Sequence, residues 1–385
     1  MSFAVDLTDV PVVDNHCHSV QRAQQHRDVP GWRALFTESP DARMRTADVA
    51  DTVFYLRLVR EQAQLFQVEP TERAVLHARA ELETDALTAL LLGDALVGGL
   101  VVDTGFPDPS GALSTQELGE AAGCSAVSLL RLELLFQQLI AEHDTLEAVQ
   151  DAIRLQLADA RRKGWSGFKS IVAYRTGLEV MTWPRHDADQ SFASARREVE
   201  RTGAVRLGHK PLLDTLLHDA FTAAAAQGLP VQFHVGYGDP DADLRLADPL
   251  QLRGVLEHRP YREMPVVLLH GCWPYVREGA YLAAVYGNAH LDLSYAIPFL
   301  SRQEMRAMTR AAFGAAPTSK LMYSSDGARV PDLHWLGAHD GRRVIGQVLG
   351  ELVDDGDLDV RQARRAGEQV LRDNAVTLYG LTGVP

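Results

Sequence analysis

Short apolar runs alternate with longer segments of helical periodicity along most of this 385-residue chain, and this alternation restricts its fold more than any other feature. Several runs are continuous in Val, Ile and Leu, which is typical of strands buried on both faces of a parallel sheet. We predict eight strands, at Val10–Asp14, Leu100–Thr104, Ala126–Glu133, Gly167–Ala173, Val231–Val235, Val266–His270, Ala289–Ser294 and Leu321–Ser325. Eight strand–helix units predict an α/β fold, a (β/α)8 TIM-like barrel.

The segments between the strands supply the helices of this barrel. The predicted helices are Leu134–Lys163, Lys210–Gln227, Tyr275–Tyr286 and Arg302–Ala312. The chain is longer than the about 250 residues typical of such a barrel, so the remainder must lie in insertions and a tail. We expect a single domain, residues 1–385, with a helical insertion at 19–99, a lid or interface arm at Thr176–Val205 and one amphipathic C-terminal helix at Val360–Leu381.

The charge and the cysteine content limit which cellular compartment and which binding partners are expected. The 38 Lys and Arg against 51 Asp and Glu give a net charge of −13, which disfavours nucleic acid as a partner. Cys17, Cys124 and Cys272 form no CxxC pair, so a reducing compartment fits better than a disulfide scaffold. The N-terminus lacks signal-peptide features, and the most apolar stretch, Ala86–Val102, is interrupted by Asp94. We expect a cytoplasmic protein that acts on a small-molecule substrate and has no membrane partner. A homo-oligomer is compatible with the sequence, which does not decide the oligomeric state.

A histidine pair follows the first predicted strand. In the segment Asp14-Asn15-His16-Cys17-His18, the spacing of two places both imidazoles on the same side of an extended backbone. Both could then reach one metal ion. Taken alone, the pair more often marks two polar residues at the start of a loop than a metal site.

Three more strand ends carry polar side chains of a similar kind. His234 and His270 end the fifth and sixth predicted strands, and Asp326 follows the eighth, each close to a glycine. Functional side chains of a barrel gather at the carboxyl ends of its strands, so these residues should converge with His16 and His18 at one mouth. Imidazoles together with a carboxylate suit Zn2+, with Mn2+ as the alternative.

Lys169 lies inside the fourth apolar strand. A buried lysine is costly unless it is paired, so it belongs either to the site or to a structural ion pair.

The ordered set of histidines, lysine and aspartate resembles the amidohydrolase superfamily of barrel enzymes. The surrounding segments resemble its amidohydrolase-2 type, and in particular the amidohydrolase domain of nodulin-like proteins fused to glutamine-synthetase-like domains. The segments that carry this resemblance are Gly167–Ser170, Tyr174–Leu178, Pro317–Asp326, Trp335–Ala338 and Asn374–Gly380. The last of these is of a kind that the family uses to close the barrel, and no glutamine-synthetase-like part is present in this sequence.

The resemblance implies one of two metal arrangements. In the first, which we favour, His16, His18, His234 and Asp326 bind one ion, and His270 acts as a proton shuttle or electrophile. In the second, Lys169 is carboxylated and bridges two ions, and His234 and His270 bind the second one. In both, metal-activated water is the nucleophile and Asp326 accepts its proton.

Substrate recognition is predicted for Lys169, Arg131, Tyr174 and Arg175, because arginine at a barrel mouth can clamp a carboxylate in a bidentate pair. The two arginines could instead form structural pairs with Glu133 or an aspartate. We expect a metal-dependent hydrolase of the C–N bond in a small carboxylated amide, of which a γ-glutamyl compound is one example. The alternatives are a metal-dependent non-oxidative decarboxylase using the same site and a catalytically silent barrel that serves as a binding module.

Overall fold

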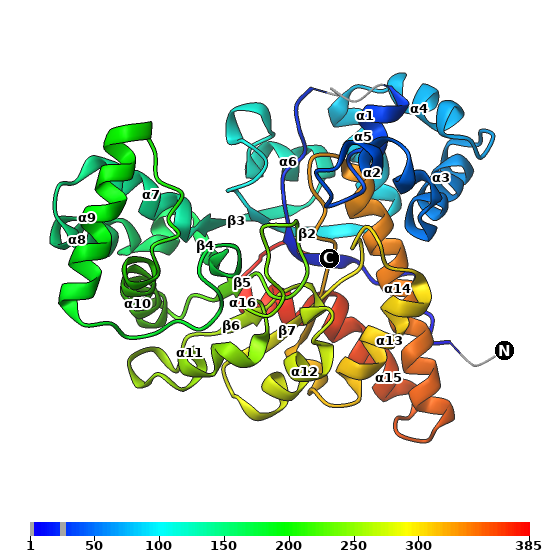
Figure 1. Ribbon diagram of the computed structural model, residues 1–385. Coiled ribbons are helices and arrows are strands. Elements are labelled where there is room, and N and C mark those ends of the chain that lie inside the picture. Colours follow the sequence, from blue (N-terminus) through cyan, green and yellow to red (C-terminus); the bar gives the residue numbers. More distant parts are fainter. Residues whose placement is uncertain (1–3, 24–27) are drawn as a thin grey trace.

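Eight parallel strands pair in the order of the sequence in the computed structural model, which describes residues 4–23 and 28–385 (Figure 1). The strands are β1 (Val12–Cys17), β2 (Val97–Asp103), β3 (Ser125–Arg131), β4 (Trp165–Ser170), β5 (Val231–Phe233), β6 (Val266–Leu268), β7 (Ala289–Ser294) and β8 (Leu321–Ser324). Helices separate successive strands, since parallel neighbours need a crossover connection. The predicted (β/α)8 barrel is confirmed.

The barrel closes between β1 and β8 through a side chain as well as through the backbone. The carboxyl group of Asp14 accepts hydrogen bonds from the backbone N–H of Ser325, at 2.9 Å, and from its hydroxyl. Just beyond the strands, Asp326 N–H donates to the His16 carbonyl at 3.0 Å, and His18 N–H donates to that of Gly327 at 2.7 Å. These bonds bring the ends of β1 and β8 together.

Several strand boundaries differ from the prediction. β1 begins and ends later than expected and includes His16, and β5 and β6 end before His234 and His270. The early end of β6 has a local reason, because the backbone N–H of His270 is bound by the Asp292 side chain and His270 adopts a left-handed φ of 62°.

The segment between β1 and β2 is helical. It contains α1 (Val29–Arg33), α2 (Ala42–Thr46), α3 (Val53–Phe66), α4 (Glu72–Ala80) and α5 (Thr84–Asp94). Residues 24–27 of the expected insertion lie outside the described part of the chain. The expected end at residue 99 is wrong, since residues 97–99 pair with β1 as the start of β2.

Buried ion pairs attach this helical segment to the long helix α14 (Pro331–Asp354). Arg79 of α4 makes a bidentate pair with Asp332, with distances of 2.9 and 2.6 Å. Arg57 of α3 lies 3.0 Å from Asp340.

Four helices form an outer group beside β3, β4 and β5: α7 (Leu132–Glu142), α8 (Leu146–Leu157), α9 (Arg185–Thr202) and α10 (Lys210–Gln227) (Figure 1). The single predicted helix Leu134–Lys163 is therefore wrong, since the Thr145 side chain caps a new helix by accepting the N–H of Ala148. In the segment Thr176–Val205, expected to be a lid or an arm, α9 packs against α7, α8 and α10. No described residue lining the central cavity comes from this segment.

The remaining α-helices are α6 (Thr115–Ala122), α11 (Arg253–Glu257), α12 (Val276–Val285), α13 (Arg302–Phe313), α15 (Val360–Glu368) and α16 (Asn374–Tyr379). Short 3-10 turns lie at Asp48–Asp51, Pro109–Gly111, Ala160–Lys163, Val172–Tyr174, Pro249–Leu252, Arg259–Tyr261, His270–Cys272 and Thr318–Lys320. Within the described ranges, no helix has both the length and the apolar character that crossing a bilayer requires.

The C-terminal segment is divided, where one helix was expected. A π-helical turn at Gln369–Asp373 separates α15 from α16 and packs against β1 and β8. Ala375 and Tyr379 of α16, with Leu381, join inward-facing strand residues in an apolar cluster that fills this end of the barrel. The strands contribute Val13, Val101, Leu129, Val267 and Met322 to the cluster, and Leu269 follows β6 directly.

Candidate metal and active site

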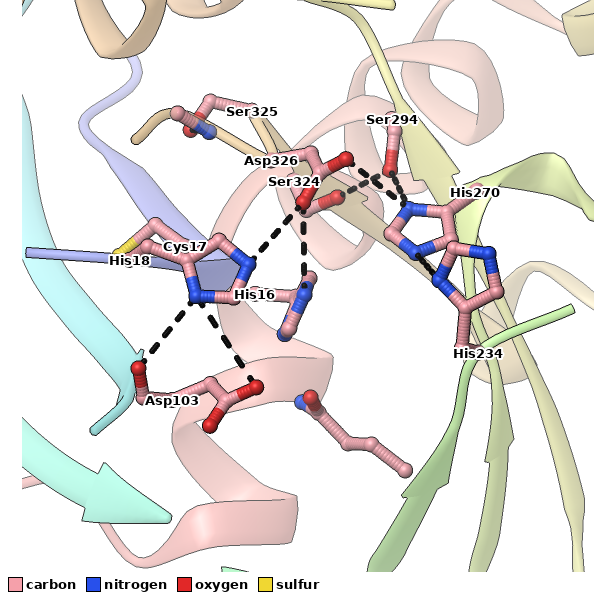
Figure 2. A network of polar contacts seen from close by, with 12 residues as sticks. His16, Cys17, His18, Asp103, His234, His270, Ser294, Ser324, Ser325 and Asp326 are labelled. Carbon is pink, nitrogen blue, oxygen red and sulfur yellow. Dashed lines mark hydrogen bonds and ion pairs between the residues drawn. The ribbon is translucent and has the colours of Figure 1, made fainter. Parts of the chain in front are cut away.

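A cavity of about 290 Å³ opens at the carboxyl ends of the strands. His16, His18, His234, His270 and Asp326 all line it, so the predicted convergence of five strand-end residues is present in the structure. Lys169, Arg131, Tyr174 and Arg175 line the same cavity. Most of the imidazoles are buried, and the carboxyl group of Asp326 lies at their centre (Figure 2).

Three of these residues are arranged as metal ligands. One ligand atom from each of His16, His18 and Asp326 lies within 4.8 Å of the others. Asp326 Oδ1 is 3.4 Å from His16 Nε2 and 3.6 Å from His18 Nε2. Two atoms bound at about 2.1 Å to one tetrahedral ion lie about 3.4 Å apart, so these separations fit a shared ion. Two imidazoles and a carboxylate are also ligands that suit a divalent ion such as Zn2+.

His234 and His270 form a second pair behind Asp326. His270 Nε2 is 3.0 Å from His234 Nδ1, and the other nitrogen of His234, Nε2, donates to the Tyr237 carbonyl at 2.6 Å. Both ring nitrogens of His234 thus have protein partners, and His234 is not among the three clustered ligand residues. His270 Nδ1 instead lies 3.4 Å from Asp326 Oδ2.

The electrostatic balance of the site favours an ionised Asp326 and neutral imidazoles at His16, His234 and His270. Burial alone would raise the pKa of the Asp326 carboxyl, but the imidazoles of His270, His16 and His18 hold it well below its usual range. Burial lowers the pKa of His16 to about 4 and lowers the pKa values of His234 and His270 well below the ordinary value. A carboxylate beside neutral imidazoles is the protonation state that a divalent cation requires.

Lys169 reaches the same group from β4. Its Nζ lies 3.3 Å from His16 Nε2, and among the described residues no carboxylate forms an ion pair with it. Burial lowers the pKa of Lys169 to about 8, although the nearby Asp103 opposes this shift. A buried lysine in this state faces the cavity beside a proposed metal ligand.

The two predicted arginines differ in their partners. Arg131 is bound to Asp103, with Nη2 2.5 Å from Oδ2 and Nε at 3.2 and 3.3 Å from the two oxygens. Asp103 in turn faces His18, whose Nδ1 is 3.4 Å from the Asp103 carbonyl oxygen (Figure 2). Arg175 forms no ion pair within the described ranges, and its buried Nε has no hydrogen-bond partner. Apart from a 3.4 Å contact of its Nη1 with the Tyr174 carbonyl, Arg175 is therefore available to a ligand, as is Lys169.

Sequence reasoning missed several residues of the site. The Tyr237 hydroxyl donates to Asp326 Oδ2 at 2.8 Å, and it lies three residues after His234 in the loop that follows β5. Glu38, from the loop between α1 and α2, lines the mouth together with Asp239 and Asp241. The pattern after β5 could have indicated Tyr237, but no local signal connects Glu38 to a site built on distant strands.

The arrangement can perform acid–base chemistry at an electrophilic centre. Asp326 can accept a proton, Tyr237 and Lys169 can donate hydrogen bonds, and Arg175 can bind an anionic group. The residues fit a divalent metal because His16, His18 and Asp326 present two imidazole nitrogens and a carboxylate oxygen together.

Three comparisons with known proteins bear on this site. A sequence profile of the amidohydrolase family (Amidohydro_2) matches residues 173–381. Protein fluG of Emericella nidulans is 28% identical over 97% of this chain, and the chain spans 46% of that curated relative, about half of its length.

The solved structures include a candidate metal-dependent hydrolase from Lactobacillus casei, with a TM-score of 0.86, 26% identity and 98% of both chains covered. A uronate isomerase from Thermotoga maritima has a TM-score of 0.68 at 14% identity, covering 97% of this chain and 95% of its own, and at that identity it supports the fold alone.

Proposed function

This chain belongs to the amidohydrolase family, and on that premise we propose that it is a metal-dependent hydrolase that cleaves the C–N bond of a small carboxylated amide. The observation that carries the proposal is the grouping of His16, His18 and Asp326 ligand atoms within 4.8 Å. The same cavity contains Arg175, which has no ion pair in the described part of the chain. The Lactobacillus casei protein, similar over nearly its whole length, supports the metal-dependent hydrolase class.

His16, His18 and Asp326 hold a divalent ion, most simply Zn2+, with Mn2+ as the alternative. His234 is the fourth ligand of our one-metal assignment, and to bind the ion its Nδ1 would have to give up the 3.0 Å contact with His270 Nε2. A bound divalent ion supplies Lewis acidity, which polarises a carbonyl and makes water nucleophilic near neutral pH.

Asp326 is the general base. It accepts a proton from the attacking water and returns it to the leaving nitrogen, so that amide and water become carboxylate and amine. The Tyr237 hydroxyl, 2.8 Å from Asp326 Oδ2, orients this carboxylate. His270 lies 3.4 Å from the same oxygen and serves as the proton shuttle beside it.

Arg175 and Lys169 bind the carboxylate of the substrate, while Tyr174 forms the adjoining wall, with its ring 4.3 Å from that of His234. The carboxyl groups of Glu38 and Asp239 line the mouth and can accept hydrogen bonds from the departing amine, and burial raises the pKa of Glu38 to about 7. These hydrogen-bond acceptors support hydrolysis, whose leaving group is an amine, over the decarboxylase alternative, which releases none. The free Cys17, Cys124 and Cys272 fit a reducing compartment, in agreement with our proposal of a cytoplasmic location.

The test is a product assay on the Zn2+-loaded protein. γ-Glutamyl-p-nitroaniline is the first probe, followed by a panel of N-acyl and γ-glutamyl amides monitored for released amine and for CO2. We expect amine release without CO2, loss of turnover in chelator, and a raised KM in Arg175→Met. Release of CO2 with no amine would establish the decarboxylase alternative, and full activity in chelator would exclude the proposed mechanism.

A further inference from the structure

Two residues of the site have a backbone conformation that side-chain-bearing residues rarely adopt. His270 has a φ of 62° and Asp326 a φ of 57°, both in the left-handed region. Each follows its strand by two residues and turns its side chain toward the other, at 3.4 Å (Figure 2). Such strain persists only where surrounding contacts over-determine the conformation. The contacts that do so should therefore be visible around both turns.

Asp14 supplies the contacts for the turn that carries Asp326. It lies on β1, is almost completely buried, and accepts hydrogen bonds from both the N–H and the hydroxyl of Ser325. The Ser325 hydroxyl oxygen accepts the N–H of Gly327 at 2.8 Å, so the residues on either side of Asp326 are held. No arginine or lysine forms an ion pair with Asp14 among the described residues.

Asp292 supplies the corresponding contacts for the turn that carries His270. It lies on β7 and is fully buried, and its Oδ1 accepts the N–H of His270 at 2.8 Å. The same oxygen accepts the Ser294 hydroxyl at 2.9 Å, and Ser294 Oγ lies 3.3 Å from His270 Nδ1. Asn15 Nδ2 donates to Asp292 Oδ2 at 2.9 Å.

A third buried carboxyl repeats the pattern without a strained residue. Glu133 accepts the Ser170 hydroxyl at 2.7 Å and the N–H of Ile171 at 3.0 Å, at the end of β4. Ile171 has a φ of −113°, which lies outside the left-handed region. Glu133 therefore provides a comparison in which the hydrogen bonds are alike but no metal ligand lies in the turn.

We propose that Asp14 and Asp292 are positioning residues, which hold the left-handed turns at the ends of β8 and β6 and so aim Asp326 and His270 at each other. Each acts through hydrogen bonds from the adjacent strand, Asp14 from β1 to the end of β8 and Asp292 from β7 to the end of β6. Neither contacts the substrate or the metal. The part concerning Asp326 rests on the proposed function, because it assumes that Asp326 is a metal ligand.

The first experiment measures Zn2+ affinity by chelator competition in purified full-length protein. Asp14→Ala should weaken binding by about 10- to 100-fold, the range expected when a partner of a metal ligand is removed. Asp14→Asn keeps an acceptor for the Ser325 N–H and should recover most of that loss. Glu133→Ala is the matched control and should keep wild-type Zn2+ affinity while losing thermal stability.

Wild-type affinity in Asp14→Ala, or an equal loss in Glu133→Ala, would overturn the assignment of Asp14. If Asp14→Ala does not fold, Ser325→Ala removes only the hydroxyl contact, and unchanged Zn2+ affinity there would overturn the same assignment. A wild-type protein that binds no Zn2+ would instead contradict the proposed function.

The second experiment needs neither metal nor substrate, and so it tests Asp292 even if the proposed function fails. Amide hydrogen exchange at His270 should accelerate by about tenfold in Asp292→Ala, since its buried N–H loses its acceptor. Asp292→Asn should restore most of the protection, and Glu133→Ala should leave exchange at His270 unchanged. Unchanged exchange in Asp292→Ala would show that Asp292 does not hold this turn.

Discussion

The two ends of the barrel use the same eight strands for opposite purposes. At the carboxyl ends lie buried imidazoles and carboxyl groups, with His270 and Asp326 in left-handed conformations. At the amino ends, Ala375, Tyr379 and Leu381 complete an apolar cluster. Burial of unpaired polar groups costs stability, whereas burial of apolar side chains provides it. The apolar amino end therefore offsets the cost of the carboxyl end, where buried polar groups and two left-handed residues lie in the candidate site.

The largest expected effect comes from Asp326 at the carboxyl end. Asp326→Asn keeps the shape and one ligand oxygen but cannot accept a proton, so turnover should fall by roughly a hundredfold or more. The folded state and weak metal binding should persist. Steady-state rates and metal content measured on the same preparation check this. Near wild-type turnover in a metal-loaded variant would show that Asp326 is not the base.

Variants of His234 and His270 distinguish the one-metal from the two-metal arrangement at the carboxyl end. On the one-metal assignment, His234→Ala loses metal, whereas His270→Ala keeps most of its metal and loses turnover. Elemental analysis of both variants decides the matter. A fall from two ions to one in His270→Ala would support the two-metal arrangement with a carboxylated Lys169.

The amino end should respond in the opposite way. Leu381→Ala removes buried apolar atoms from the cluster below the strands and should lower the free energy of unfolding by about 2–5 kcal/mol. Its Zn2+ affinity should remain that of wild type, because no metal ligand lies in this cluster. Denaturant unfolding measures the loss of stability, and chelator competition measures the Zn2+ affinity. A parallel loss of Zn2+ affinity would contradict the separation of a stabilising amino end from a metal-binding carboxyl end.

The smallest effect concerns pH and stability. His290, at the start of β7, has a pKa lowered to about 4 by burial, with a further contribution from Lys320. Below the unfolded pKa of about 6.5 the unfolded chain binds a proton that the folded one does not, so this residue reduces stability as pH falls from about 6.5 to about 4.

His290→Gln should therefore flatten the pH dependence of unfolding over that interval. Denaturant unfolding at several pH values checks this against wild type. The matched variant His186→Gln, in the exposed first turn of α9, should leave the curve unchanged. Identical curves for His290→Gln and wild type would contradict the prediction.

The strand ends show what could be predicted and what could not. His16, His18, His234, His270 and Asp326 were identifiable because each follows an apolar run, and the barrel places such positions at one mouth. The partner of Arg131 was not identifiable, since Asp103 lies 28 residues away on another strand. The break at Thr145 was not identifiable for a different reason. Apolar residues keep helical spacing on both sides of it, so periodicity alone does not reveal that Thr145 caps a second helix.

The sequence by itself determined the barrel and the residue types at its mouth, because hydrophobic periodicity and strand-end position are properties of local segments. Only the tertiary structure decided which atoms face one another. Closure of β1 against β8 brings Asp14 to Ser325, 311 positions away, and sets Asp326 between His16 and His270. It also pairs Arg131 with Asp103 and leaves Arg175 without an ion pair to any described residue. Such contacts depend on the register and closure of the whole sheet, and no local pattern encodes them.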